Sequence, residues 1–353
     1  MNDKMIFTED ISQEVLEKIK TLNWYRHGIY TTNIFQSSYG VMRLGQEWFK
    51  EEWIDKGFLN IVYLGSEVFI TENELEEFSD IMFNKINTDQ DYLKKYIKKY
   101  REDNKSFLED ATRIGNEFDP EMSNEDLSGL LVEFLESSSK TFHWLWSMEF
   151  LNPAIDKFIR INVKKHQPTW SEEEVDNFLT AISHTSKKLP FQIEKEESLK
   201  IDFEDLETIK DMHKRFAWLN MYFWDGHPFT FEEYKSRLLK MAKDDVTKRD
   251  VEEFNNKSLE ADALIQGVGD KNLREILKII QDLIFLKTER IDVYTISCYK
   301  IFNILKEICK RLDLSRDQLL TFTRDEILSF LKGQPIPNDI KKREKFGCAV
   351  FNG

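Results

Sequence analysis

The sequence predicts a mainly α protein: a multi-helix, bundle-like assembly with a small β element near residues 27–70. Glycine and proline are scarce, with 13 Gly and 7 Pro in 353 residues, which suits long helices better than a turn-rich β protein. Apolar residues make up 41% of the chain, so a sizeable core can be buried. Helix starts are also well marked, because a Ser or Thr repeatedly precedes an acidic or amide residue by three positions.

Six such pairs have the pattern of a capping box, in which two backbone N–H groups at a helix start are satisfied reciprocally. Most of them are followed by apolar residues at helical spacing, so each predicts a helix start. The pairs are Thr71 and Glu74, Ser123 and Asp126, Ser171 and Glu174, Thr230 and Glu233, Ser315 and Gln318, and Thr323 and Glu326.

The β element is predicted from local composition. Residues 58–70, FLNIVYLGSEVFI, are rich in β-branched and aromatic residues around Gly65-Ser66, which is a hairpin signal. Residues 27–42 are expected to add strands beside this hairpin. The last residues, KFGCAVFNG, are typical of the beginning of another strand.

Residues 89–117 are predicted to form an amphipathic helix with a solvated basic side. Tyr92, Tyr96 and Tyr100 are spaced by four, and lysines lie between them. The alternative is a basic and aromatic surface that contacts phosphate or RNA. Residues 124–165 are also expected to be helical, with Pro153 marking a kink or a break.

The polar segment 187–203 is the best predicted boundary between two lobes. Residues 1–190 are expected to form an N-terminal helical lobe with the small β-hairpin, and residues 191–353 a C-terminal helical lobe. Gly267 and Asp270 are typical of a helix stop followed by the N-cap of the next helix.

Charge and cysteine content argue against two classes of protein, nucleic-acid-binding proteins and disulfide-stabilised proteins. The net charge of −14 and the pI of about 5.1 disfavour nucleic-acid binding. Three cysteines do not suggest a disulfide framework, and Cys298 and Cys309, eleven apart on one expected helix, are interpreted as buried small hydrophobes. Without the apolar run of a signal peptide or of a membrane span, the sequence predicts a reducing, cytoplasmic setting and no membrane partner.

The sequence contains none of the common catalytic signatures. There is no GxxxxGK[ST], HExxH, paired CxxC or GxSxG motif, so we expect no catalytic residue and no metal ligand in this chain. His184, in AISHTSKK, superficially resembles a phosphohistidine motif, but its flanks lack the glycine-rich and alanine-rich residues of such motifs. We interpret it as an ordinary histidine at a helix end.

Two segments supply candidate substrate-binding residues. The segment 213–229, HKRFAWLNMYFWDGHPF, is the densest aromatic cluster, and aromatic walls with a few charges can form a ligand pocket. The alternative is core between helices that ends at an Asp-Gly turn. In the long helix, charged residues interrupt an apolar run and either mark the solvated side or face a phosphorylated partner. The candidates are Arg215, Trp218, Tyr222, Trp224, Lys287 and Arg290.

The C-terminal part of the chain resembles a known family. The segment 277–290, LKIIQDLIFLKTER, leads through a further helix and Arg311-Leu312 to the segment 320–327, LTFTRDEI. This order is similar to the helical region of phosphoenolpyruvate-utilising enzymes, which include phosphoenolpyruvate synthase, pyruvate phosphate dikinase and rifampicin phosphotransferase. Upstream, His213–Trp218 is similar to a histidine and tryptophan segment of these enzymes, and Arg343 sits where an arginine often precedes their swivelling domain. The resemblance covers roughly residues 205–350.

The resemblance implies the helical, substrate-side or linker portion of a phosphotransferase. The chain departs from the complete enzymes because it shows neither an ATP-grasp nucleotide site nor the Thr-Ser-His motif, and it ends about where the swivelling domain would begin. ATP and Mg²⁺ are therefore expected only on a separate domain. The implied partners are phosphohistidine-carrier and ATP-grasp domains or subunits and a small-molecule acceptor. The alternative is a non-catalytic helical interaction or scaffold protein.

Overall fold

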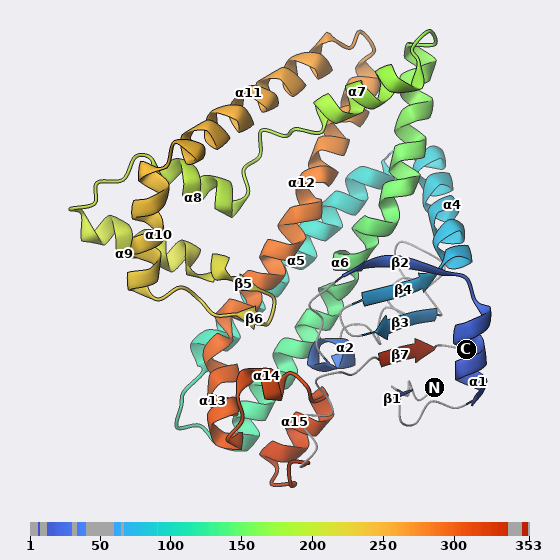
Figure 1. The fold of residues 1–353 in the computed structure, drawn as a ribbon. Helices are drawn as coiled ribbons and strands as arrows, with labels where there is room; N and C mark the ends of the chain where they lie inside the picture. Colours follow the sequence, from blue (N-terminus) through green and yellow to red (C-terminus); the bar gives the residue numbers. More distant parts are fainter. Residues whose placement is uncertain are drawn as a thin grey trace. The chain divides into compact units, whose positions relative to one another are not determined.

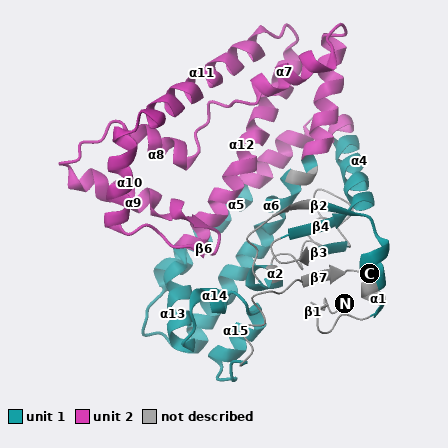
Figure 2. Cartoon of the chain, in the orientation of Figure 1, with its two compact units in different colours: residues 1–85, 102–151, 300–353 teal, residues 86–101, 152–299 magenta. Residues whose placement is uncertain are grey.

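A computed structural model confirms the mainly α class (Figure 1). It forms two compact units, each assembled from separated segments (Figure 2). Unit 1 comprises residues 1–85, 102–151 and 300–353, and unit 2 comprises residues 86–101 and 152–299. The predicted boundary at 190/191 falls inside unit 2, at the first residue of α8 (Pro190–Ser198). The structure describes residues 6–7, 13–29, 34–39, 60–64, 67–89, 91–337 and 348–351.

Unit 1 contains a five-stranded sheet in the order β1-β7-β3-β4-β2. The predicted hairpin is confirmed, because β3 and β4 pair antiparallel in the register Ile61 with Ile70 and Leu64 with Glu67. The expected C-terminal strand is β7, which pairs with β3 and β1. The strands are β1 (Ile6–Phe7), β2 (Trp24–Ile29), β3 (Asn60–Leu64), β4 (Glu67–Thr71) and β7 (Cys348–Phe351).

The expectation of further strands over residues 27–42 is only partly correct. Strand β2 covers the start of that range, but α2 (Ile34–Tyr39) follows it as a helix. The physical reason is an aromatic pair at helical spacing. Phe35 and Tyr39 lie one turn apart, are both buried, and meet edge to face with ring centroids 5.4 Å apart.

The parts of α5 (Tyr92–Glu117) and α6 (Asn124–His166) that belong to unit 1 pack apolar faces together. Phe107 and Phe134, on these two helices, have ring centroids 5.5 Å apart. Gly115 lies so close to the Lys300 carbonyl oxygen that a Cβ atom would stand 2.3 Å from it. Only glycine therefore fits at this position of α5. The remaining helices are α1 (Gln13–Thr21), α4 (Glu72–Thr88), α13 (Phe302–Leu312), α14 (Arg316–Leu319) and α15 (Arg324–Leu331).

Helix α5 has the predicted amphipathic pattern. Tyr92, Tyr96 and Tyr100 are buried, whereas Lys94 and Lys98 are exposed. The alternative of a joint basic and aromatic surface is wrong, because the tyrosine rings belong to the core. Helix α6 runs through Pro153 without a break in its helical span.

Unit 2 is helical apart from one short hairpin. Buried side chains of α9 and α10 form one hydrophobic cluster, and the partly buried Ile193 of α8 packs against it; the cluster consists of Ile209, Met212, Phe216, Tyr234, Leu238 and Met241. A charged pair also joins α8 to α10. The fully buried carboxylate of Glu194 accepts hydrogen bonds from Arg237 Nε at 3.0 Å and from Nη2 at 2.8 Å. The elements are α7 (Glu172–Ile182), α9 (Leu206–Phe216), η2 (Ala217–Asn220), β5 (Met221–Tyr222), β6 (Asp225–Gly226), α10 (Phe231–Lys243), α11 (Asp245–Gly267) and α12 (Lys271–Lys300).

All six predicted capping pairs lie at helix starts. Complete capping boxes form before α7, α10, α14 and α15. Before α6, the Ser123 hydroxyl accepts a hydrogen bond from the Asp126 N–H at 3.1 Å, and before α4 the Thr71 hydroxyl donates to Glu74. The helix stop at Gly267 is confirmed as well, and the Asp270 carboxylate caps α12 at the Leu273 N–H.

Both described cysteine side chains are buried, as predicted. The expectation that they share one helix is wrong, because α12 ends at Lys300 and α13 begins at Phe302. Burial raises the pKa of Cys298 and also that of Cys309, which reaches about 11. Both thiols are therefore protonated near neutral pH.

Candidate functional site

The six predicted binding residues lie in different environments. Three are buried (Trp218, Trp224 and Arg290), Lys287 is half-buried, and Arg215 and Tyr222 are exposed. Arg215, near the end of α9, donates to both carboxylate oxygens of Glu197 at 2.8 and 2.7 Å. This bidentate pair lies at the surface, since the Arg215 side chain is 44% exposed. The guanidinium is thus already committed to a carboxylate 18 residues away in the sequence.

The predicted aromatic cluster is divided between core and surface. Trp218 and Trp224 are only 4% and 2% exposed, and Trp218 Nε1 donates to the Arg215 carbonyl oxygen at 2.9 Å. For these two indoles, the alternative interpretation as core is confirmed. Tyr222, on β5, is the exposed member of the cluster.

The tip of the β5–β6 hairpin is fastened to α12. Phe223 has φ 53°, a left-handed conformation that is rare for a bulky residue. Its backbone N–H donates to the buried Thr295 hydroxyl at 3.2 Å, and its ring meets Tyr294 edge to face at 5.1 Å. The hairpin that carries Tyr222 therefore lies against α12 about one turn after Arg290.

The charged stretch of α12 is partly buried, and Arg290 is its most buried member. Arg290 is 4% exposed, and Glu289 and Asp292 are half-buried. Burial raises the pKa of Glu289, and burial together with the charge of Glu289 raises that of Asp292 to about 7. The alternative that these charges only mark the solvated side of the helix is wrong for Arg290.

Sequence reasoning missed Glu289 and Asp292 as candidate residues. Their spacing of three places them on neighbouring positions of one helical face, which the sequence could have shown. Their burial could not be read locally, because the covering residues include Tyr100 on α5. The Tyr100 hydroxyl lies 3.4 Å from the Leu286 carbonyl oxygen, and burial raises its pKa.

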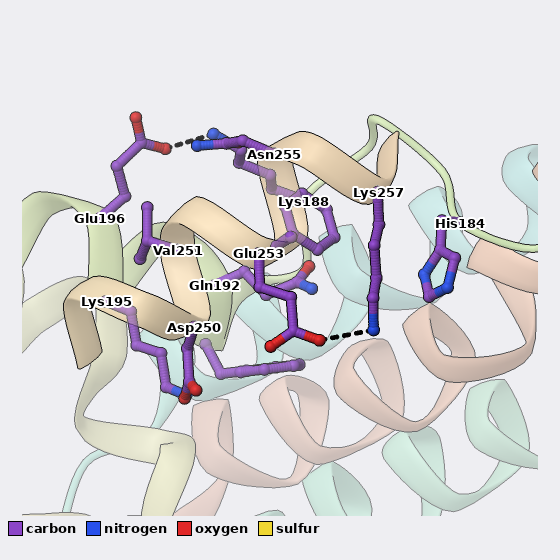
Figure 3. Close-up of a pocket in the computed structure, with 12 residues that line it drawn as sticks. His184, Lys188, Gln192, Lys195, Glu196, Asp250, Val251, Glu253, Asn255 and Lys257 are labelled. Carbon is purple, nitrogen blue, oxygen red and sulfur yellow. Dashed lines mark hydrogen bonds and ion pairs between the residues drawn. The ribbon is translucent and has the colours of Figure 1, made fainter. Parts of the chain in front are cut away.

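A separate pocket of about 270 Å³ lies between α8 and α11 (Figure 3). Helix α8 contributes residues 191, 192, 195 and 196, and α11 contributes residues 250, 251, 254 and 255. Each set has the spacing of one helical face, so the two faces are opposed. His184 and Lys188, from the connection between α7 and α8, complete the wall with Glu253 and Lys257.

Aromatic and aliphatic side chains from both helices provide the apolar surface of this pocket: Phe191 from α8, and Val251 and Phe254 from α11. Three oppositely charged pairs surround them, Lys188 with Glu196, Lys195 with Asp250, and Lys257 with Glu253. Figure 3 shows the first and the last of these pairs as dashed lines. The hydrogen bond from Lys188 is the main cause that lowers the pKa of Glu196.

A larger and more polar cavity, of about 440 Å³, lies at the N-terminal ends of α5 and α12. Two of its carboxylates, those of Asp89 and Asp270, already accept hydrogen bonds from residues close in the sequence. Asp89 accepts from the Asp91 N–H at 3.0 Å and from Lys95, and Asp270 caps α12. This cavity is therefore the weaker candidate for a binding site.

Within the described ranges, no group of three or more His, Cys, Asp or Glu side chains could hold a metal ion. No helix in the described part of the chain is both long and apolar enough to cross a membrane. Comparison of the chain with protein-family models, curated proteins and solved structures gives no match.

Proposed function

We propose that the chain is the helical, acceptor-side portion of a phosphotransferase that resembles phosphoenolpyruvate-utilising enzymes. The burial of the charged stretch in α12 is the observation that carries this proposal. Arg290 is almost fully buried, and Glu289 and Asp292 are half-buried with raised pKa values. Burying ionisable groups costs several kcal/mol each, and groups with perturbed pKa values concentrate at functional sites.

The chemistry of the stretch suits an acceptor site. Phosphoryl transfer depends mainly on positioning and on stabilising charge, so a site without its own nucleophile is physically sensible. The Arg290 guanidinium has the geometry that favours phosphate oxygens. Asp292, with a pKa of about 7, can accept a proton from an acceptor hydroxyl near neutral pH.

Binding of a phosphohistidine carrier tests the proposal. The full chain is titrated by calorimetry with an intact carrier domain from a phosphoenolpyruvate synthase, once phosphorylated by its ATP-grasp domain and ATP and once unphosphorylated. We expect binding that is tighter for the phosphorylated carrier. Arg290→Met should weaken it, whereas Arg215→Met should not, because Arg215 is paired with Glu197 at the surface.

Circular dichroism of both variants shows whether the helical fold is kept. Lysine at position 290 provides a second variant that retains the positive charge, so Arg290→Lys should bind better than Arg290→Met. Failure of the wild-type chain to bind either form of the carrier would contradict the proposal.

The second candidate is a non-catalytic helical interaction protein. This function is favoured because the predicted contact residues already interact within the protein. Arg215 pairs with Glu197, and Trp218 and Trp224 lie in the core. This function predicts no heat of binding with phosphoenolpyruvate, phosphate or nucleotides. It also predicts a protein partner that stays bound through purification of the tagged chain.

A further inference from the structure

The pocket between α8 and α11 has balanced charges. Its lining includes three lysines and three carboxylates, and each lysine pairs with a carboxylate of the same lining. A charged ligand would lose hydration on entry and would find no unpaired side-chain charge of opposite sign in this lining. Glu196 also pairs with Lys200, which is 70% exposed and lies outside the lining. The pocket therefore favours an uncharged ligand.

Three polar side chains of the lining remain available for hydrogen bonds. Gln192 uses its Oε1 to accept from the Leu189 N–H at 2.8 Å, which leaves its amide N–H groups. The His184 ring and the Asn255 amide have no hydrogen-bond partner within the described part of the chain. In Figure 3, the labelled side chains come from both helices and from the preceding connection.

The apolar surface and the size of the pocket restrict the ligand further. Phe191 is 40% exposed, which is high for a large aromatic ring, and Phe254 and Val251 are only half-buried. The pocket volume of about 270 Å³ lies just below the range of roughly 300–1,000 Å³ that is typical of small-molecule sites. One or two planar rings match these dimensions and the aromatic lining.

We propose that this pocket binds an uncharged aromatic molecule of one or two rings that carries a hydrogen-bonding group such as a carboxamide. The ring contacts Phe191 and Phe254, and the polar group is held by Asn255 and Gln192. The proposal is independent of the phosphotransferase function, because none of these residues belongs to the charged stretch of α12.

Three probes that share one aromatic ring but differ in charge show how the charge of a ligand affects its binding. Benzamide is neutral, benzoate is an anion and benzamidinium is a cation, and each is titrated into the full-length chain with ligand-observed NMR. We expect benzamide to bind at least about fivefold more tightly than either charged probe, because only the neutral one avoids uncompensated desolvation. Equal or tighter binding of either charged probe would overturn the proposal, as would no saturation by benzamide up to about 10 mM.

Two substitutions locate the binding and test its charge selectivity. Asn255→Ala should weaken benzamide binding, whereas Leu259→Ala, which removes a 69% exposed side chain elsewhere on α11, should leave it unchanged. Asn255→Asp adds a negative charge that no lysine of the lining balances, so it should reverse the preference towards benzamidinium. If Asn255→Asp kept the order of the three probes, the pocket would not be their site.

Discussion

The side-chain amide of Gln281, buried on α12, donates a hydrogen bond to the carbonyl oxygen of His184 at 2.9 Å. The same nitrogen also lies 3.3 Å from the carbonyl oxygen of Ile182, the last residue of α7. A helix leaves its last carbonyl groups without partners inside the helix. Gln281 therefore supplies a hydrogen-bond donor to the carbonyl groups at the end of α7. It also holds the backbone of His184, whose side chain lines the pocket.

Removing this amide should destabilise the protein. Gln281→Met keeps the approximate shape but leaves the carbonyl groups of Ile182 and His184 without this donor, which should lower the free energy of unfolding by about 1–3 kcal/mol. Urea denaturation followed by circular dichroism measures the change. Lys278→Met, at an exposed position of the same helix, is the control and should stay within about 0.5 kcal/mol of wild type.

The Glu194–Arg237 pair should contribute far more to the free energy of unfolding than the Arg215–Glu197 pair. Arg237→Met leaves the fully buried Glu194 carboxylate without its bidentate partner, which should cost about 3 kcal/mol of unfolding free energy. Arg215→Met breaks a bidentate pair at the surface and should cost less than about 1 kcal/mol. Chemical denaturation of both variants compares them directly, and similar losses would refute the assignment of Glu194 as a buried charge.

Asp292 should make stability depend on pH. Its pKa in the folded protein, about 7, exceeds the ordinary value of 3.8, so the folded state holds its proton more tightly than the unfolded state. Its favourable contribution is complete below about pH 4 and is lost as the pH rises to about 7. Relative to Asp292→Asn, the wild-type chain should therefore lose on the order of 1–3 kcal/mol between these limits.

The measurement is a series of urea unfolding curves from pH 4.5 to 8 for wild type and Asp292→Asn. Asp262→Asn, at an exposed position of α11, serves as the matched control and should follow the wild-type curve. A constant difference between wild type and Asp292→Asn over this range would show that Asp292 does not titrate there.

Two glycines in helices should respond in opposite directions to alanine. Gly115→Ala would place a Cβ atom 2.3 Å from the Lys300 carbonyl oxygen, so a backbone must shift and stability should fall by about 1–3 kcal/mol. At Gly129 of α6, an added Cβ would meet nothing within 4 Å, so Gly129→Ala should stabilise by about 0.5–1 kcal/mol. Thermal unfolding midpoints measure both changes, which should be a decrease for Gly115→Ala and an increase for Gly129→Ala.

The features predicted correctly from the sequence depend on residues close together in the chain. The capping box at Ser171, for example, needs only Glu174, three positions away, to be recognised and formed. The β3–β4 hairpin is similarly local. The prediction of strands over 27–42 was wrong where the β propensity of single residues competed with the one-turn spacing of Phe35 and Tyr39.

The candidate site was less predictable because its determinants are distant in sequence. Arg215 has the chemistry of a ligand contact, but in the folded chain it pairs with Glu197, 18 residues earlier in the sequence. The pocket between α8 and α11 joins residues 184–196 to residues 250–257, and neither segment carries a recognisable motif. The resemblance of residues 205–350 to phosphoenolpyruvate-utilising enzymes stays a prediction.

The interleaving of the two units has a practical consequence for dissecting this protein. The chain passes from one unit to the other at 85/86, 101/102, 151/152 and 299/300, and each point lies within a helix, namely α4, α5, α6 and α12. Domain borders ordinarily fall in exposed linkers, where a chain can be cut or spliced without harm. Here a truncation at any of these four points removes part of at least one hydrophobic interior, so deletion variants would misfold and would not reveal the role of either unit. Point substitutions in the intact polypeptide are the appropriate tool for assigning its activities.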